Sequence, residues 1–333
     1  MKKVLLIILC LCSFPILHAQ YVPDELGKQF VKRTIVMPSD YEGKVVCTLI
    51  KYTGLNLSDK AVLYIHGYND YFFQTEMADR FAKAGYRFYA VDLRKCGRSI
   101  LPNQFATNAK DMSEYFADID TARAIIEHEG ASKMILIGHS MGGLITSLYA
   151  DAKGNNLKFD AMILNAPFFD FNENAWNEKV AIPTVSFLSR FLPDMTVTGS
   201  TSTAYGESLH RKYHGEWNYD LSKKALSSGA KHWCWIAAIH RGQEKVRSGL
   251  NIDCPILSLS SAKSVHGANW NTEFQHADAV LDVKDIQQLS NNLGQKTTIA
   301  IIPGAMHDVI LSPKNVRDAA YRKMFRWLSN QGL

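Results

Sequence analysis

The chain has 333 residues, of which 47% are hydrophobic and 21% are charged, and its formal net charge is +5. This composition is that of an ordinary globular protein, and the length suits one α/β domain with an insertion. The excess of positive charge is small and no basic run alternates with aromatic residues, so we expect no nucleic-acid partner.

Residues 1–19 have the pattern of a secretory signal peptide. Lys2 and Lys3 are followed by an almost wholly apolar run, 4–17, and then by the small residue Ala19. We therefore expect cleavage near Ala19 and a soluble protein exported to the periplasm or out of the cell. The apolar run is short for a membrane span, although a retained N-terminal anchor is the alternative.

Beyond the predicted signal peptide the chain holds four cysteines, Cys47, Cys96, Cys234 and Cys254. In an oxidising compartment they allow three pairings, between which the sequence does not choose, and buried free thiols are an equal alternative. Their irregular spacing is unlike that of a zinc site, so we predict no metal.

Short apolar segments alternate with amphipathic segments along most of the remaining chain. The former predict strands and the latter helices. The predicted strands are 31–37, 44–52, 61–65, 86–91, 133–137, 159–164, 255–259 and 297–302. The predicted helices are 75–84, 111–129, 144–150, 283–291 and 313–328.

The alternation fails over 168–250, which is rich in aromatic residues and has helical pieces without clear strands. We interpret 168–250 as a helical cap inserted into a core formed by 20–167 and 251–333. Strands that alternate with helices predict an α/β fold with a mostly parallel, eight-stranded sheet flanked by helices on both faces. In such folds the chemistry lies at the carboxyl ends of the strands.

A Gly-x-Ser-x-Gly pattern lies between the predicted strand 133–137 and the predicted helix 144–150. Its residues are Gly138-His139-Ser140-Met141-Gly142-Gly143. A serine on such a sharp strand-to-helix turn is typical of a nucleophile elbow, because the glycines remove side chains that would collide with neighbouring backbone. Ser140 is therefore the predicted nucleophile. A glycine-rich turn that holds a serine by chance is the alternative.

A serine hydroxyl needs a base, because it is a weak nucleophile at neutral pH. His307 is the predicted base, since it alone among the histidines follows the final predicted strand. His139 adjoins the serine, but neighbouring side chains on the elbow diverge. We expect His66 to pack or to bond the backbone.

The acid that orients the base should follow the predicted strand 255–259, and four carboxylates compete there: Glu273, Asp278, Asp282 and Asp285. Asp282 precedes a helix and is suited to cap it. Asp285 falls inside that helix, and Glu273 lies in the middle of the loop. Asp278 has no visible structural duty, so we predict Asp278 as the acid, with Asp282 as the second choice.

An acyl-transfer site also needs two donors for the oxyanion. One expected donor is the backbone N–H of Met141, directly after the nucleophile. The other is the N–H of Tyr68, which follows His66-Gly67 at the end of a predicted strand. A simple strand-ending turn is the alternative for His66-Gly67.

These residues resemble the α/β-hydrolase superfamily, and within it the monoacylglycerol-lipase and serine-aminopeptidase branch. The matching segments are His66-Gly67, Asp92 with Gly97-Arg98-Ser99, Gly138–Gly143, and the Gly-x-x-His that ends at His307. The resemblance covers nearly all of the chain after residue 19 and implies a cap over the site. It implies Ser140, Asp278 and His307 as catalytic residues, acyl transfer as the reaction, and no cofactor.

The chain departs from this branch in two places. The usual glycine-histidine-glycine after Asp92 is replaced by Lys95-Cys96-Gly97. The loop before Asp278 is also longer than expected. The first departure concerns the wall of the pocket, and the second concerns the assignment of the acid.

The leading hypothesis is a carboxylic-ester hydrolase that acts on lipophilic esters, such as acylglycerol-like or lysophospholipid-like molecules. Five apolar residues of the cap have helical spacing and would line an acyl pocket, contact a membrane surface transiently, or pack the cap onto the core. They are Val185, Phe187, Leu188, Phe191 and Leu192. We expect a small-molecule substrate and no protein partner.

Two alternatives remain. In a serine aminopeptidase, a cap carboxylate such as Glu207, Glu216 or Glu244 would hold the substrate amine. A binding protein would keep the fold without turnover.

Overall fold

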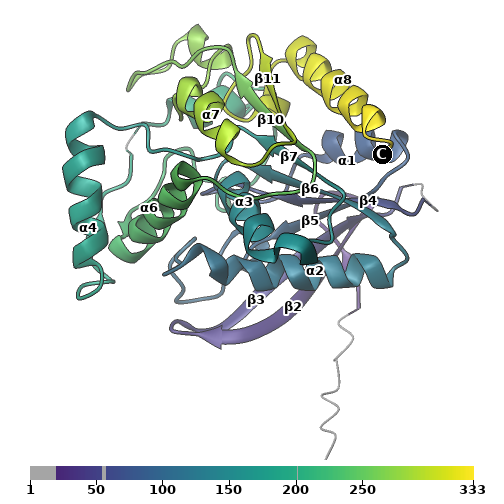
Figure 1. The fold of residues 1–333 in the computed structure, drawn as a ribbon, viewed down its shortest axis with the longest axis horizontal. Coiled ribbons are helices and arrows are strands. Elements are labelled where there is room, and N and C mark those ends of the chain that lie inside the picture. The colour runs from purple at the N-terminus through teal and green to yellow at the C-terminus, as the bar shows by residue number, and fades with distance from the viewer. Residues whose placement is uncertain (1–19, 55–57, 201) are drawn as a thin grey trace, which may run out of the picture.

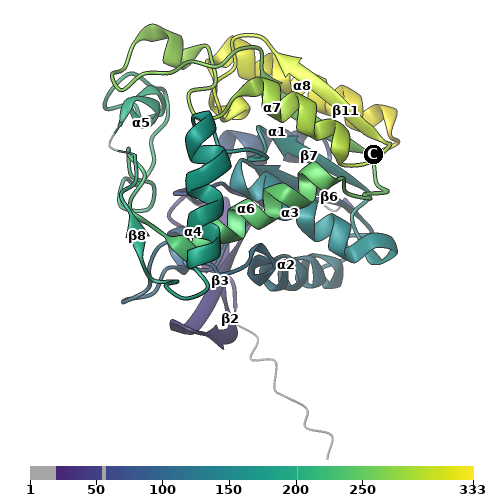
Figure 2. The ribbon, with the colours of Figure 1, turned by 60° about the vertical axis from the view of Figure 1, so that its left-hand side comes forward.

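The computed structural model describes residues 20–54, 58–200 and 202–333 (Figures 1 and 2). The predicted signal peptide, 1–19, lies outside these residues. Among the helices of the described ranges, none has both the length and the apolar character that a membrane span requires.

Within the described chain, nine strands form one central sheet in the order β1-β2-β3-β5-β4-β6-β7-β10-β11. They are β1 (Val22–Pro23), β2 (Phe30–Asp40), β3 (Gly43–Tyr52), β4 (Lys60–Ile65), β5 (Arg87–Asp92), β6 (Lys133–His139), β7 (Ala161–Asn165), β10 (Ile256–Ser261) and β11 (Thr297–Ile302). The pairs among β1, β2, β3 and β5 are antiparallel and the others are parallel. The predicted mostly parallel sheet is confirmed, and β1 adds a two-residue edge strand to the eight expected strands.

Helices cover both faces of this sheet (Figure 1). They are α1 (Thr75–Lys83), α2 (Phe116–His128), α3 (Met141–Lys153), α4 (Ile182–Leu188), α5 (Ala204–Leu209), α6 (Trp233–Ser248), α7 (Val283–Leu289) and α8 (Lys314–Asn330). Helices α1 and α8 pack on one face, and α2, α3 and α6 pack on the other. The predicted helix 111–129 begins as a 3-10 turn, Met112–Tyr115, and Asp111 and Glu114 form a capping box that satisfies backbone N–H groups at its start.

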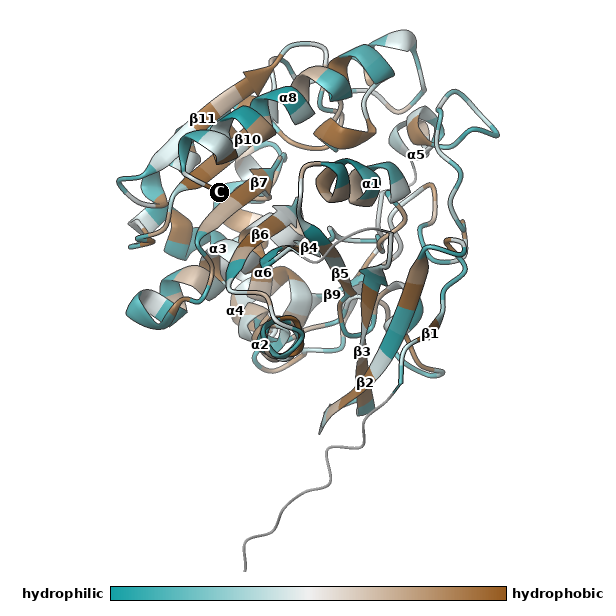
Figure 3. Cartoon of the chain, turned by 90° about the vertical axis from the view of Figure 1, so that its right-hand side faces the viewer, coloured by the Kyte–Doolittle hydropathy of each residue, from teal (hydrophilic) through white to brown (hydrophobic). Residues whose placement is uncertain are grey.

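Strand β4 shows how the two faces are filled. Leu63 and Ile65 belong to the apolar cluster of α2 and α3, whereas Val62 and Tyr64 belong to that of α1 and α8. Successive side chains of a strand point to opposite faces, so a central strand covered on both sides is apolar throughout. Figure 3 shows the central strands largely hydrophobic and the outer side of α8 hydrophilic.

The insertion 168–250 holds α4, α5 and α6, together with a two-stranded ladder of β8 (Thr196–Val197) and β9 (Lys231–His232). The sequence predicts no clear strands here, because strands of two residues are too short to show alternation. Figure 2 shows α4 lying outside α6. Helix α6 packs on α3, and its Trp235 and Ile239 belong to the main core cluster.

The four cysteines of the described chain are free thiols. Cys47, Cys96 and Cys234 are buried, and Cys254 is half-buried. Burial raises the pKa of each thiol. Of the two alternatives, disulfides or buried free thiols, the structure shows free thiols.

Candidate active site

Ser140 occupies a sharp turn between the end of β6 and the start of α3. Its φ of 51° and ψ of −117° lie in a region that costs a non-glycine residue about 1–3 kcal/mol. The flanking glycines make this turn possible. A Cβ on Gly138 would lie 2.5 Å from the carbonyl oxygen of Gly142, and one on Gly142 would lie 2.5 Å from that of Ile65. The local geometry is therefore that of the predicted elbow.

His307 follows β11 and forms a hydrogen bond with Asp278, 2.9 Å from Nδ1 to Oδ2. Both side chains are buried. A carboxylate accepts, so Nδ1 carries the proton and Nε2 is left as the acceptor. The second oxygen of Asp278, Oδ1, accepts from the backbone N–H groups of Val280 and Leu281, each at 2.8 Å. The carboxylate is thus fixed on both sides.

The other three candidate acids have different partners. Asp282 caps α7 by accepting from the N–H of Lys284 at 2.8 Å, as expected. Glu273 forms an ion pair with Lys263. Asp285 lies in α7, where burial, with nearby carboxylates, raises its pKa to about 6. The structure therefore places Asp278, and none of these three, on His307, although Asp278 also closes its own turn.

Asn165, at the end of β7, joins the elbow to the loop of His307. Its carbonyl oxygen accepts from the N–H of Ser140 at 3.0 Å. Its side chain donates to Asp308 Oδ1 at 2.6 Å and accepts from the N–H of Val309 at 3.0 Å. One buried residue therefore contacts both segments that carry the predicted serine and histidine.

The loop after β4 approaches the elbow closely. A Cβ on Gly67 would lie 3.1 Å from that of Ser140, so glycine permits this approach. His66 bonds the backbone, as expected: its ring is 2.7 Å from the carbonyl oxygen of Gly67 and accepts from the N–H of Leu93 at 3.0 Å. Tyr68 comes next and packs on Trp235. The oxyanion donors Tyr68 and Met141 stay a prediction.

Two residues that the sequence reasoning set aside or did not name lie beside His307. The ring of His139 is 5.0 Å from that of His307, and its Nε2 is 3.8 Å from Asp308 Oδ2. Burial lowers the pKa of His139, which favours the neutral ring. The sequence held one indication of this contact: His139 directly precedes Ser140, and Asp308 directly follows His307.

Ser140 and His307 line one cavity of about 430 Å³, a volume within the usual range for small-molecule sites. The insertion and the long loop before Asp278 supply much of its wall. Its apolar lining residues include Leu209, Leu226, Phe274 and Val280, and its polar ones include Asn69, Asn172, Ser200, Lys224 and His266. Asn172, Ser200 and Lys224 come from the insertion, and the sequence reasoning missed them because no motif places its loops over the elbow. Asn69 lies in the loop after β4, and His266 lies in the loop after β10.

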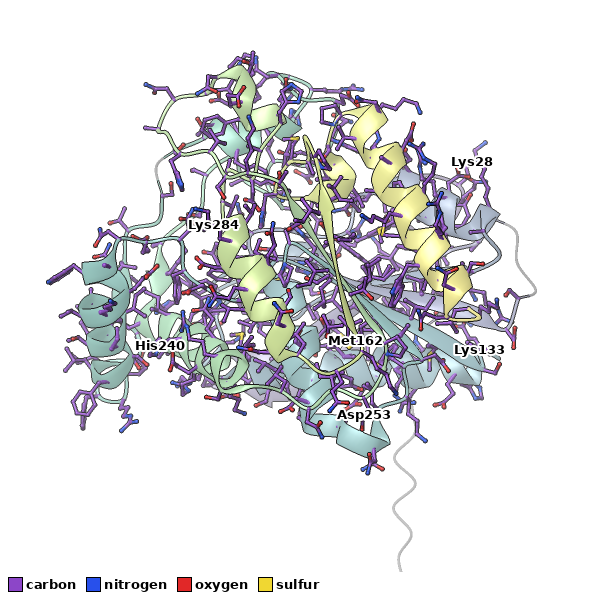
Figure 4. The ribbon with its side chains drawn as sticks, turned by 45° about the horizontal axis from the view of Figure 1, so that its top comes forward. Lys28, Lys133, Met162, His240, Asp253 and Lys284 are labelled. Carbon is purple, nitrogen blue, oxygen red and sulfur yellow. The ribbon has the colours of Figure 1, made fainter. Side chains whose placement is uncertain are left out.

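A second cavity, of about 690 Å³, is lined by none of the predicted catalytic residues, Ser140, Asp278 and His307. It lies between α4 and α6 and is lined by Phe187, Arg190 and His240 among others. Figure 4 shows His240 on the side of the molecule that carries α4. The predicted nucleophile and base therefore lie at the smaller cavity.

The departure at Lys95-Cys96-Gly97 does not change that cavity, because none of these residues lines it. Lys95 is buried and forms an ion pair with Asp40, 2.7 Å from Nζ to Oδ2. Cys96 contacts Thr107.

The sheet order, the elbow and the histidine after the last strand together define an α/β hydrolase. Residues 57–314 match the serine aminopeptidase S33 family (Hydrolase_4), and the chain therefore belongs to this family.

One curated protein is similar to this chain in sequence, and two solved structures are similar to it in fold. A monoacylglycerol lipase of Mycolicibacterium smegmatis is 30% identical over 138 residues, which span 41% of this chain and about half (47%) of that protein. A monoglyceride lipase from Saccharomyces cerevisiae, solved as a soluble variant with a substrate analogue, has a TM-score of 0.66 and 17% identity over 93% of this chain and 99% of that one. A carboxyl esterase from Bacillus coagulans has a TM-score of 0.64 and 15% identity over 92% of this chain and all (100%) of that one. The two solved structures share the fold.

Proposed function

We propose that the protein is an exported serine hydrolase that cleaves carboxylic esters of lipophilic molecules, with Ser140, His307 and Asp278 as its catalytic triad. The observation that carries the proposal is the His307–Asp278 hydrogen bond at a cavity that Ser140 also lines. The relatives named monoacylglycerol lipase, monoglyceride lipase and carboxyl esterase support the choice of esters.

The proposed mechanism is acyl transfer. Ser140 Oγ attacks the ester carbonyl while His307 Nε2 takes its proton, and Asp278 holds the ring in the required tautomer and stabilises the imidazolium. The N–H groups of Tyr68 and Met141 bind the developing oxyanion. His307 then protonates the leaving alcohol. It next activates water, which cleaves the acyl-enzyme and restores Ser140.

Exposed apolar residues of the insertion support contact with a membrane surface. Phe187 is 56% exposed, Phe191 is 71% exposed and Leu192 is 49% exposed. These side chains do not pack the insertion onto the core, whereas Val185 does. An amphipathic element with an outward apolar side binds the interfacial region of a bilayer. We propose that this surface makes transient contact where lipophilic esters are found.

The aminopeptidase alternative needs a free carboxylate in the cavity, and none of the three cap candidates supplies it. Glu207 accepts from the Thr203 hydroxyl at 2.6 Å. Glu216 is paired with Arg317 and Glu244 with Arg247. None of the three lines the cavity that holds Ser140. The structure also offers no observation that favours a binding protein without turnover.

The test is hydrolysis of p-nitrophenyl esters of graded acyl length beside aminoacyl anilides, with Ser140→Ala as the control. We expect ester turnover that the substitution abolishes, together with labelling of Ser140 by a fluorophosphonate. Preference for the anilides would contradict the ester assignment. Absence of both turnover and labelling would contradict the hydrolase. N-terminal sequencing of the secreted or periplasmic protein tests export.

A further inference from the structure

Among the residues that the structure describes, the lining of the cavity at Ser140 contains a basic side chain and no acidic one. Lys224 is the one lysine or arginine among its described lining residues, and no aspartate or glutamate is among them. Lys224 belongs to the insertion, so it reaches the site from outside the core.

The ammonium of Lys224 meets a carboxylate that is buried behind it. Its Nζ is 3.0 Å from Oδ1 of Asp70, and the two side chains are 10% and 1% exposed. The ammonium of Lys224 has three N–H donors and also lines the cavity, so a donor that does not face Asp70 can bind a ligand there.

Asp70 stays ionised in this position. Burial acts to raise its pKa, but attraction to Lys224 and a hydrogen bond with it lower the pKa below its usual range. The pair is neutral as a whole, with its positive end at the cavity and its negative end in the protein. A ligand in the cavity meets the positive end.

The loop that carries Lys224 is fixed to the core. The side chain of Asn69 donates to the carbonyl oxygens of Ala225 and Ser227 at 2.9 and 3.4 Å. The hydroxyl of Tyr71 accepts from the N–H of Asp220 at 2.8 Å. Because these bonds hold the loop on both sides of Lys224, the ammonium is preorganised, and a ligand does not have to order it.

We propose that the preferred ester carries an anionic group, a carboxylate or a phosphate, and that Lys224 binds this group while Ser140 attacks the ester. The proposal rests on the ester hydrolysis proposed above and names the substrate class for that same site. A charged hydrogen bond in a partly closed cavity is stronger than a neutral one. The apolar walls at Leu209, Leu226 and Phe274 leave room for a hydrocarbon portion of the same molecule.

The experiment compares kcat/KM within matched pairs of esters that differ in one anionic group. Mono-p-nitrophenyl adipate is paired with p-nitrophenyl hexanoate and presents a carboxylate. 1-Butyrylglycerol 3-phosphate is paired with 1-butyrylglycerol and presents a phosphate. The two pairs distinguish the two anions, and the neutral members test ester hydrolysis by itself.

The variants are Lys224→Met, Asp70→Asn and the double variant with both substitutions. The double variant removes both charges, so it leaves no unpaired buried carboxylate to perturb folding. Lys223→Met is the matched control, because Lys223 pairs with Glu25 and does not line the cavity. Circular dichroism melting verifies that each variant is folded.

We expect the wild type to favour the anionic member of at least one pair. In Lys224→Met and in the double variant, kcat/KM for that member should fall about 10- to 100-fold, while the neutral member changes less than about 3-fold. Asp70→Asn and Lys223→Met should retain the preference. If the role of Lys224 were purely structural, its substitution would lower kcat/KM equally for the anionic and the neutral ester of a pair.

Two results would overturn the proposal. Hydrolysis of the neutral esters with no preference in either pair, or with a preference that survives in the double variant, would refute Lys224 as an anion site and leave the ester hydrolase intact. Failure to hydrolyse any of the four esters would refute both.

Discussion

Replacing Asp278 with asparagine should abolish most of the activity because of which atom the amide presents to His307. Oδ1 of Asp278 accepts two backbone N–H groups at 2.8 Å, whereas Oδ2 accepts from one histidine nitrogen. An asparagine will direct its oxygen to the two backbone donors and its NH₂ to His307. The NH₂ then donates to Nδ1 and forces the proton onto Nε2, which can no longer accept the serine proton.

The expected loss of kcat follows from this change in the tautomer of His307. A histidine held in the wrong tautomer lowers kcat by about 10⁴-fold in a serine–histidine–aspartate site. Loss of the charged acceptor at the two backbone N–H groups should also cost about 1–3 kcal/mol of the free energy of unfolding. Kinetics with a p-nitrophenyl ester and urea unfolding measure the two effects separately.

Asp282→Asn is the matched control, because asparagine caps a helix about as well as aspartate. Its kcat and its unfolding free energy should both stay close to those of the wild type. The reasoning is refuted if Asp282→Asn loses the activity and Asp278→Asn keeps it.

Three further changes test other parts of the structure. Gly142→Ala should reduce the unfolding free energy by at least about 2 kcal/mol, since the added Cβ collides with the backbone of β4; an unchanged melting temperature would show that the elbow tolerates it. Substitution of Phe187 and Phe191 by serine should weaken sedimentation with lipid vesicles and leave turnover of a water-soluble ester unchanged; equal vesicle binding would remove these residues from the proposed surface. Burial raises the pKa of Asp285 to about 6, above its usual 3.8, so this group stabilises the fold below pH 4 and loses that contribution as the pH rises through 6. Asp285→Asn should therefore stabilise the protein by about 1 kcal/mol at pH 7, a value reduced for solvent screening, and by nothing at pH 4, as urea unfolding at both pH values would reveal.

The sequence predicted the central fold well because its signals are local. Each strand of the parallel sheet is a short apolar run, and the elbow is one hexapeptide, Gly138–Gly143. Asp282 was correctly predicted as a helix cap, since that role depends on its neighbours in the chain.

Features that depend on distant segments could not be predicted. Lys224 is unremarkable in its own segment and becomes part of the cavity only through the folding of the insertion over the elbow. The packing of His139 beside His307 likewise joins the end of β6 to the loop after β11, which are far apart in the sequence. The turn closed by Asp278 is local, but it could not be predicted, because Asp278-Ala279-Val280-Leu281 contains no glycine or proline to indicate a turn.

The two sets of hydrogen bonds made by Asn165 have a consequence for how this scaffold can change. The backbone carbonyl of Asn165 holds Ser140 and its side chain holds Asp308 and Val309, so the spacing of Ser140 and the neighbouring His307 is set beneath the cavity. The loops above can therefore diverge in length and composition at little cost to that spacing. A chimera that takes the insertion, 168–250, from another relative would change which molecules enter the cavity and keep the relative positions of Ser140 and His307.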